Sequence, residues 1–322
     1  MKHILALHTG GTISMTATDT GAVVPSDVNP LLDLSAHLDG IDVISEEVFN
    51  LPSPHVTPTQ MLTLSRRIRA AESEGIDGVV VTHGTDTLEE TAYFLDLTLD
   101  PTIPVVVTGA MRSSNEIGSD GRYNFLSAIR TAASDGARGK GCLVVMNDEV
   151  HTARFVTKTH TTNVATFRTP TFGPIGLVTK DGAHFFQELI NQQACPVDTV
   201  TDNVFLLKAF AGMDGTLFDA LPATTHGLVI EALGAGNLPP ATLPALGRLL
   251  ARGVPVVLVS RCFNGVAEDF YDYEGGGVTL KKMGVIFCQG LNGQKARIKL
   301  IVGLSGGKRG AALATYVNNA VS

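Results

Sequence analysis

The 322-residue sequence lacks the patterns that mark a disulfide framework or a nucleic-acid surface. Its four cysteines, Cys142, Cys195, Cys262 and Cys288, lie far apart and form no Cys-x-x-Cys pair. Such scattered cysteines indicate reduced core thiols in a cytosolic protein. No basic run occurs, and 24 Lys and Arg against 31 Asp and Glu give a formal net charge of −7. Nucleic-acid binding needs clustered positive charge, so nucleic acid is not an expected partner.

Signals for export, membrane insertion and metal binding are also missing. The N-terminal "MKHILALHTGG" carries one lysine and an apolar stretch too short for a signal peptide. No apolar run reaches the length that crosses a bilayer. We therefore expect a cytoplasmic protein that does not bind membranes. Without an H-E-x-x-H motif or a Cys/His cluster, His8 and His83 are expected to be structural, and no metal or cofactor is expected.

Hydrophobic residues are abundant, at 44%, and the chain is long enough for two cores. Four continuous β-branched runs are typical of strands buried on both faces: residues 3–9, 78–83, 104–109 and 141–147. Helical spacing falls between them, at residues 58–75, 87–99 and 122–136. This alternation predicts an α/β fold with a mostly parallel sheet between helices. A ligand should then bind beyond the carboxyl ends of the strands.

The chain changes character at "QQACPVDTVTDN" (192–203), which is polar and has no periodicity. A shorter α/β series follows, with strand-like runs at 204–210, 227–233, 255–260 and 284–287 and helical patterns at 240–253 and 292–305. We predict an N-terminal α/β catalytic domain (1–195), a linker (196–203) and a smaller C-terminal α/β domain (204–322). "MTATDTGAVVPSD" (15–27) is interpreted as a mobile polar loop.

The first predicted strand ends in "TGGT" (9–12), a sharp turn with hydroxyls on both sides. A phosphate-binding loop would need a third glycine or a following lysine, and would lead into a helix. The sequence supplies none of these features. A turn in which the glycines are only steric is as well supported as a functional loop.

The second predicted strand also ends in a Gly–Thr pair, in "THGTDT" (82–87). Thr85 and Asp86 then lie at a strand end and a helix start, where backbone N–H groups favour an anion. A plain N-cap would explain Asp86 or Thr87, but not the whole cluster. A third stretch, residues 152–170, places Lys158 among seven threonines. Lys158 is either a solvated loop residue or a partly desolvated amine that acts as a base or charge partner.

These stretches together resemble the bacterial-type L-asparaginase (asparaginase/glutaminase) family, and the chain looks like a cytosolic-type member. The resemblance extends from residue 4 to about residue 300. The motifs that carry it are "TGGTI", "HGTDTLEETAYFL", "PVVVTGAMR", "VVMND", "VTKTHTTNVATF" and "NGQKAR". Family membership implies hydrolysis of the L-asparagine side-chain amide to L-aspartate and ammonia, with room for a minor glutaminase activity. It implies two α/β domains and a homodimer or homotetramer with sites at the subunit interface.

The resemblance also implies residue roles. Thr12 matches the nucleophile, while Thr85, Asp86 and Lys158 match the second catalytic group. Activation of a threonine hydroxyl requires an adjacent base. Desolvation favours Lys158 as that base, whereas the Asp86 charge opposes it.

The expected substrate site includes Ser53 for the α-carboxylate and Asp86, beside Thr85, for the α-amino group. Gly11 and Ala110 belong to the same site, and Asn237 matches a residue that reaches a neighbouring subunit's site.

Two positions depart from the family pattern. Many members have a tyrosine shortly after the first threonine, but residues 13–40 contain none. Tyr273, near Tyr271, is our candidate for that role; two surface tyrosines are an equally good interpretation. Pro54 replaces the glutamine that follows the serine in many relatives, which bears on substrate selectivity.

Three other functions are less well supported by the sequence than asparagine hydrolysis. A non-catalytic asparagine or aspartate sensor would keep the pocket without turnover. An amidotransferase subunit of the same fold carries an extra N-terminal domain, for which a "TGGTI" beginning at residue 9 leaves no room. A nucleotide-binding protein would need the lysine and glycine spacing that "TGGT" lacks.

Overall fold

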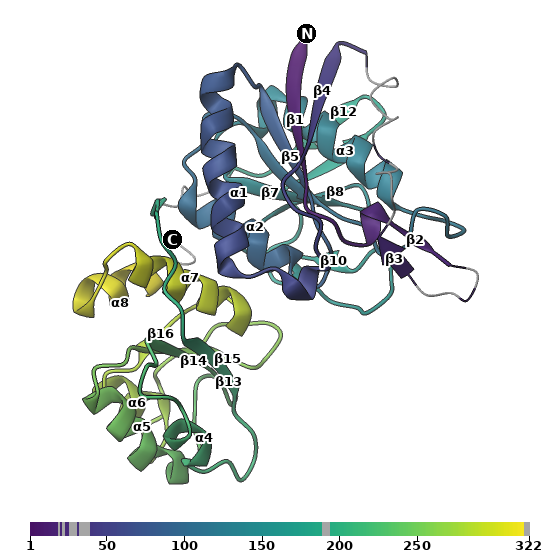
Figure 1. Ribbon diagram of the computed structural model, residues 1–322. Helices are drawn as coiled ribbons and strands as arrows, with labels where there is room; N and C mark the ends of the chain where they lie inside the picture. The colour runs from purple at the N-terminus through teal and green to yellow at the C-terminus, as the bar shows by residue number, and fades with distance from the viewer. Residues whose placement is uncertain (19, 21–22, 26–30, 32–38, 189–193, 319–322) are drawn as a thin grey trace. The chain divides into compact units, whose positions relative to one another are not determined.

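The computed structural model describes the chain except for residues 19, 21–22, 26–30, 32–38, 189–193 and 319–322. It divides into two compact units, Met1–Ala194 and Cys195–Ser322, which are described separately (Figure 1). The assignment of 196–203 as a linker between independent domains stays a prediction. Residues 192 and 193 of the polar stretch lie outside the described residues.

In the described part of the first unit, an eight-stranded sheet has the order β12-β11-β8-β7-β6-β5-β1-β4. Its strands are β1 (Lys2–His8), β4 (Ile41–Glu47), β5 (Gly78–Thr82), β6 (Val105–Thr108), β7 (Cys142–Met146), β8 (Glu149–Thr152), β11 (Gly176–Thr179) and β12 (Gly182–Phe185). β4, β1, β5, β6 and β7 run parallel, while β8, β11 and β12 continue antiparallel beyond β7. The mixed α/β fold confirms the predicted class. Sequence analysis missed β4, β8, β11 and β12 because they lack a continuous β-branched apolar run.

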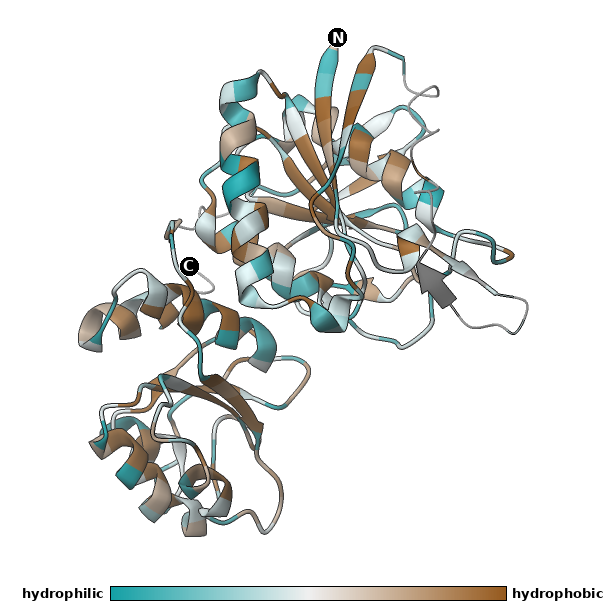
Figure 2. Cartoon of the chain, viewed as in Figure 1, coloured by the Kyte–Doolittle hydropathy of each residue, from teal (hydrophilic) through white to brown (hydrophobic). Residues whose placement is uncertain are grey.

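Helices cover both faces of this sheet, and its central strands are largely hydrophobic (Figure 2). α1 (Pro58–Ala71) and α2 (Leu88–Thr98) bury one face, and α3 (Gly121–Ala133) buries the other. Alternate residues of β1 serve the two cores: Leu5 and Leu7 lie in the first, Ile4 and Ala6 in the second. Burying a leucine or isoleucine side chain contributes about 1.5–3 kcal/mol to the free energy of folding. Burial on both faces therefore fixes the register of β1 strongly.

The strand register brings three carboxyl ends together. His8 pairs with Thr82 and Thr82 with Thr108, so β1, β5 and β6 end side by side. The backbone pairing continues one residue further, because Thr9 N–H donates to the Thr82 carbonyl (3.2 Å) and His83 N–H to the Thr108 carbonyl (2.8 Å). The "TGGT", "HGTDT" and "TGA" loops therefore begin next to one another, as expected for a site at this edge.

Two short hairpins are separate from the main sheet. β2 (Met15–Ala17) pairs antiparallel with β3 (Val23–Pro25), and β9 (Thr157–Lys158) pairs with β10 (Phe167–Arg168). The first hairpin corrects the interpretation of residues 15–27 as a loop: strand pairing satisfies backbone groups despite the polar sequence. Residues 19, 21–22 and 26–27 of that stretch lie outside the described residues.

The second unit has a parallel sheet in the order β13-β14-β15-β16. Its elements are β13 (Val204–Lys208), α4 (Thr216–Asp219), β14 (Gly227–Ala232), α5 (Leu243–Ala251), β15 (Val256–Ser260), α6 (Gly277–Lys282), β16 (Ile286–Phe287), α7 (Gly293–Ser305) and α8 (Gly310–Asn318). Leu228, Ile230 and Leu258 of the sheet pack with Leu246 of α5 and Leu280 of α6 in one core. The smaller α/β unit thus has its own hydrophobic interior.

The cysteine prediction needs one correction. All four cysteines are free thiols; Cys142, Cys195 and Cys288 are buried, but Cys262 is exposed. Burial raises the pKa of the Cys288 thiol to about 12 and that of Cys142 well above its usual range. Cys262 lies in the loop after β15, where its side chain is exposed.

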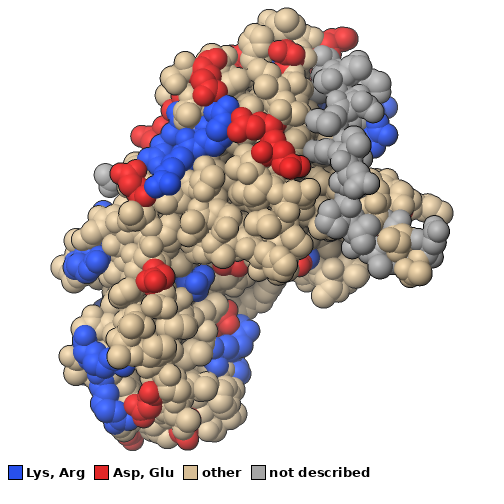
Figure 3. All heavy atoms as spheres, viewed as in Figure 1, with Lys and Arg blue, Asp and Glu red and all other residues tan. Residues whose placement is uncertain are grey.

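The surface mixes charges of both signs. On the face that Figure 3 shows, basic and acidic atoms lie beside one another over the first unit. Arg67, for example, forms ion pairs with Glu46 (2.8 Å) and Glu74 (2.9 Å). Among the described residues, the helices are too short or too polar to span a membrane.

Candidate active site

Two glycines in direct contact bring together the loops that carry Thr12 and Thr85. Gly11 has φ +85°, and a Cβ built on it would lie 2.3 Å from Gly84 Cα. Only a residue without a side chain fits there, since the conformation is left-handed and the space is filled. Thr12 directly follows Gly11 and Thr85 directly follows Gly84. The two predicted catalytic threonines therefore lie on loops that touch each other.

Replacement of Gly11 by alanine should therefore destabilise the first unit by at least about 3 kcal/mol, from backbone strain and overpacking. Turnover should also fall roughly 10²-fold, because the loop that carries Thr12 must shift. Gly75→Ala is the matched control: Gly75 has φ +78° but open space around its Cβ position. It should cost only about 1 kcal/mol. Equal losses in chemical denaturation would refute the steric role of the Gly11–Gly84 contact.

Ser53 contacts the "HGTDT" loop that follows β5. It begins a short 3-10 turn (Ser53–His55) and is 5% exposed. Asp86 N–H donates to Ser53 Oγ (3.2 Å), and the Thr87 hydroxyl donates to the Ser53 carbonyl (2.8 Å). Thr87 is the N-cap residue of α2, yet its hydroxyl makes this loop contact and no side-chain cap. The structure thus places Ser53 beside Thr85 and Asp86.

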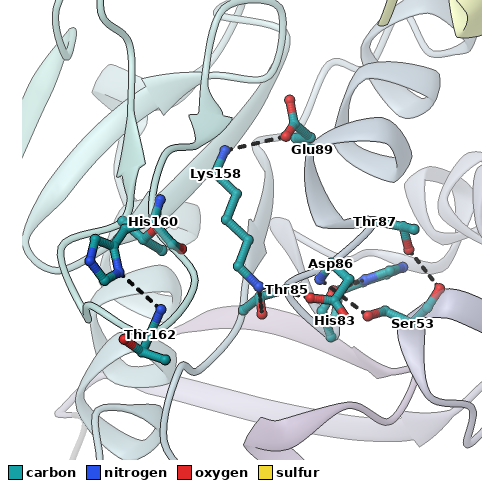
Figure 4. A network of polar contacts seen from close by, with 11 residues as sticks. Ser53, His83, Thr85, Asp86, Thr87, Glu89, Lys158, His160 and Thr162 are labelled. Carbon is teal, nitrogen blue, oxygen red and sulfur yellow. Dashed lines mark hydrogen bonds and ion pairs between the residues drawn. The ribbon is translucent and has the colours of Figure 1, made fainter. Parts of the chain in front are cut away.

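Lys158 joins the predicted catalytic residues in one contact set (Figure 4). Its Nζ donates to Thr85 Oγ1 (2.9 Å) and to Asp86 Oδ1 (2.8 Å). The Lys158 side chain is 18% exposed and that of Asp86 59%. Lys158 Nζ is therefore sheltered against Thr85, whereas Asp86 keeps most of its carboxylate open to a ligand.

The loop after β6 completes the site. A Cβ on Gly109 would lie 3.3 Å from Thr85 Cγ2, so this loop touches the "HGTDT" segment, and Ala110 follows directly. The Asp120 carboxylate accepts the backbone N–H groups of Met111 (3.1 Å) and Arg112 (3.0 Å). Asn124 donates to the Gly109 carbonyl (3.0 Å), so the first turn of α3 fixes the loop from both sides.

His8 and His83 are buried structural residues at the ends of β1 and β5. His83 Nδ1 pairs with the Gly84 carbonyl (2.8 Å) and Nε2 with the Thr91 hydroxyl (2.9 Å). Because a carbonyl only accepts, Nδ1 carries the proton and Thr91 donates to Nε2. Burial lowers the pKa of both His8 and His83 to about 4. No group of three or more potential metal ligands occurs in the described residues.

These two histidines predict acid sensitivity. Between pH 6.5 and about 4 the unfolded chain binds protons that the folded chain excludes, so the free energy of unfolding falls as pH drops through that window. The loss reaches about 3 kcal/mol per histidine by pH 4. In denaturation curves between pH 4 and 7, His83→Gln should show a shallower pH dependence than wild type. An unchanged dependence would contradict the burial argument.

Tyr273 and Asn237 belong to the second unit. The Tyr273 side chain is 52% exposed and stacks beside Tyr271, with ring centroids 5.6 Å apart. Asn237 pairs with Leu233 in an isolated antiparallel bridge, and its Oδ1 is buried without a hydrogen-bond partner among the described residues. Their roles at a catalytic site stay predictions.

Comparison with known proteins decides the family. Residues 3–191 match the family model "Asparaginase, N-terminal", and residues 203–317 match "Glutaminase/Asparaginase C-terminal domain". The chain belongs to the asparaginase family.

Individual relatives agree with the family assignment. The chain is 40% identical to a probable L-asparaginase of Deinococcus radiodurans, over 94% of this chain and 92% of that protein. It is 34% identical to an L-asparaginase of Bacillus licheniformis, over 96% and 97% respectively. Among solved structures, the probable cytoplasmic L-asparaginase of Campylobacter jejuni has a TM-score of 0.87 at 33% identity, covering 100% of this chain and 99% of that one.

Membership in the asparaginase family confirms the predicted relationship and the amidohydrolase class. The residue roles stay predictions, although Gly11, Ser53, Thr85, Asp86 and Lys158 occupy one connected region. Sequence analysis missed the supporting side chains Glu89, Asp120 and Asn124. Glu89 lies inside a quoted motif, but nothing in its pattern distinguishes a supporting carboxylate from a solvated helix residue.

Proposed function

We propose that the chain hydrolyses the side-chain amide of L-asparagine to L-aspartate and ammonia, with Thr12 as the nucleophile. The observation that carries this proposal is the contact of Lys158 Nζ with the Thr85 hydroxyl and the Asp86 carboxylate. The loop of Thr85 and Asp86 touches the glycine turn that precedes Thr12, in a chain of the asparaginase family.

The proposed reaction has two halves. Thr12 Oγ attacks the amide carbon while its proton passes through Thr85 to the Lys158 amine. The C–N bond then breaks as the amide nitrogen takes up that proton and leaves as ammonia. Water hydrolyses the resulting aspartyl ester and regenerates the Thr12 hydroxyl. Backbone N–H groups of the Gly11 turn are suited to stabilise the oxyanion.

Substrate orientation comes from charged and polar groups of the same region. The exposed Asp86 carboxylate would bind the substrate α-amino group, and Ser53 its α-carboxylate. Gly11 and Ala110 would line the amide end. Tyr273 is proposed to polarise the Thr12 hydroxyl, and Asn237 to reach the site of another subunit.

The wider proposal is a cytoplasmic homodimer or homotetramer with sites at subunit interfaces. A minor glutaminase activity agrees with the family description, which names both amides. One additional methylene changes discrimination by about 1–3 kcal/mol, so the two substrates should differ in rate rather than in whether they react.

Ammonia release from the purified protein tests the function. L-asparagine should give sustained ammonia release, and L-glutamine a slower one. Thermal stabilisation by asparagine or aspartate without any ammonia would instead support the sensor function. A thermal shift with ATP or NAD and none with L-aspartate would favour nucleotide binding.

A further inference from the structure

Glu89, in the first turn of α2, contacts the strand that carries Lys158. Its carboxylate is buried, at 4% exposure. Oε1 accepts the Thr157 hydroxyl (3.0 Å) and the backbone N–H of Lys158 (3.2 Å). Figure 4 shows Glu89 at the backbone end of Lys158, with Thr85 and Asp86 at its ammonium end. A carboxylate is favoured at this helix start by the exposed N–H groups of the first turn.

One short segment therefore fixes Lys158 at both ends. Thr85 and Asp86 accept from Nζ, and Glu89, three residues beyond Asp86, accepts from the backbone N–H. A lysine side chain has four rotatable bonds, so a contact at Nζ alone leaves much conformational freedom. Fixing the backbone as well restricts the positions that the amine can reach.

The hairpin has other anchors, which separate folding from positioning. Val156 and Phe167 are buried in the first core, and Arg168 forms an ion pair with Glu149 (2.7 Å). These contacts hold β9 and β10 onto the unit without touching Thr85 or Asp86. Loss of Glu89 should thus leave the hairpin folded but Lys158 less well placed.

We propose that Glu89 is a positioning residue for amide hydrolysis, holding the Lys158 backbone so that Nζ meets Thr85. This inference rests on the proposed function. The Thr157 hydroxyl and the Lys158 backbone N–H both donate to Glu89 Oε1, so this role needs a hydrogen-bond acceptor at that position. A glutamine carbonyl can take the place of Oε1.

Steady-state kinetics with L-asparagine tests the proposal in Glu89→Ala, Glu89→Gln, Thr157→Val and wild type. Glu89→Ala should lower kcat about 10²-fold, the scale of an approximately 1 Å misplacement. KM should stay within about 3-fold, because Ser53 and Asp86 are untouched. Glu89→Gln should restore kcat to within about 5-fold of wild type, and Thr157→Val, which keeps the Lys158 N–H bond, should lower kcat less than Glu89→Ala.

The outcomes separate this inference from the function itself. An inactive wild type would overturn the proposed function. An active wild type with an unchanged kcat in Glu89→Ala, an effect confined to KM, or no recovery in Glu89→Gln would overturn only the positioning role. If Glu89→Ala fails to fold, Thr157→Val decides: a lowered kcat at unchanged KM supports the role, and wild-type kinetics overturn it.

Discussion

Thr12→Val is expected to lower kcat for L-asparagine by at least about 10⁴-fold while L-aspartate still binds. Valine matches threonine in shape and is also β-branched, so the short 3-10 turn Thr12–Ser14 should persist. What disappears is the hydroxyl oxygen that we propose as the nucleophile. Because Asp86 and Ser53 remain, a thermal shift with L-aspartate should resemble that of wild type.

A matched substitution checks that the loss comes from this one hydroxyl. Thr63 lies on α1, is exposed, and donates its hydroxyl to the Thr59 carbonyl. Thr63→Val makes the same chemical change away from the glycine turn and should leave kcat within about 3-fold, since exposed helix positions tolerate it. Ammonia assays on both variants are sufficient. If Thr12→Val keeps more than a tenth of the wild-type rate, Thr12 is not the nucleophile.

Lys158→Met should produce the second largest loss, about 10³-fold in kcat. Methionine keeps a long unbranched stem but removes the amine nitrogen Nζ, which lies 2.9 Å from Thr85 Oγ1 and 2.8 Å from Asp86 Oδ1. In this variant Thr85 has no amine to which it could pass the Thr12 proton. Stability should change by only about 1 kcal/mol or less, because the Asp86 carboxylate is 59% exposed and water replaces its partner.

The control for this variant is an exposed lysine elsewhere in the first unit. Lys180 follows β11 and is exposed. Lys180→Met should turn over asparagine at the wild-type rate. Both kcat and the melting temperature need to be measured, since a large fall in Lys158→Met stability would indicate a structural ion pair. A kcat within 3-fold of wild type would remove Lys158 from the mechanism.

Much of the fold follows from the sequence because buried parallel strands leave a strong local signal. β1, β5, β6 and β7 are continuous apolar runs, and the helices between them have a clear periodicity. The edge strand β4 has only partly exposed and exposed residues, and the short antiparallel β11 alternates buried and exposed ones. Their pairing depends on neighbouring strands, which local sequence does not encode.

The candidate site, like the fold, could be predicted only in part from the sequence. Thr12, Thr85 and Asp86 follow strand ends, so parallel pairing alone predicts their proximity. Lys158 is 72 residues beyond Asp86, and only the three-dimensional structure brings its Nζ to 2.8 Å from that carboxylate. Glu89 and Asp120 were missed because each acts through backbone N–H groups of another segment, Glu89 on Lys158 and Asp120 on the loop after β6. Any acidic residue in a first helical turn has the same sequence pattern.

Trapping the covalent intermediate tests the central claim most directly. Wild-type protein is quenched with acid during turnover of L-asparagine, digested with trypsin and analysed by tandem mass spectrometry. Arg66, Arg67 and Arg69 lie between Thr12 and Thr85, so the two threonines fall on different peptides. The account predicts an aspartyl ester on Thr12 that is absent in Thr12→Val. An ester on Thr85, or one that persists in Thr12→Val, would contradict it.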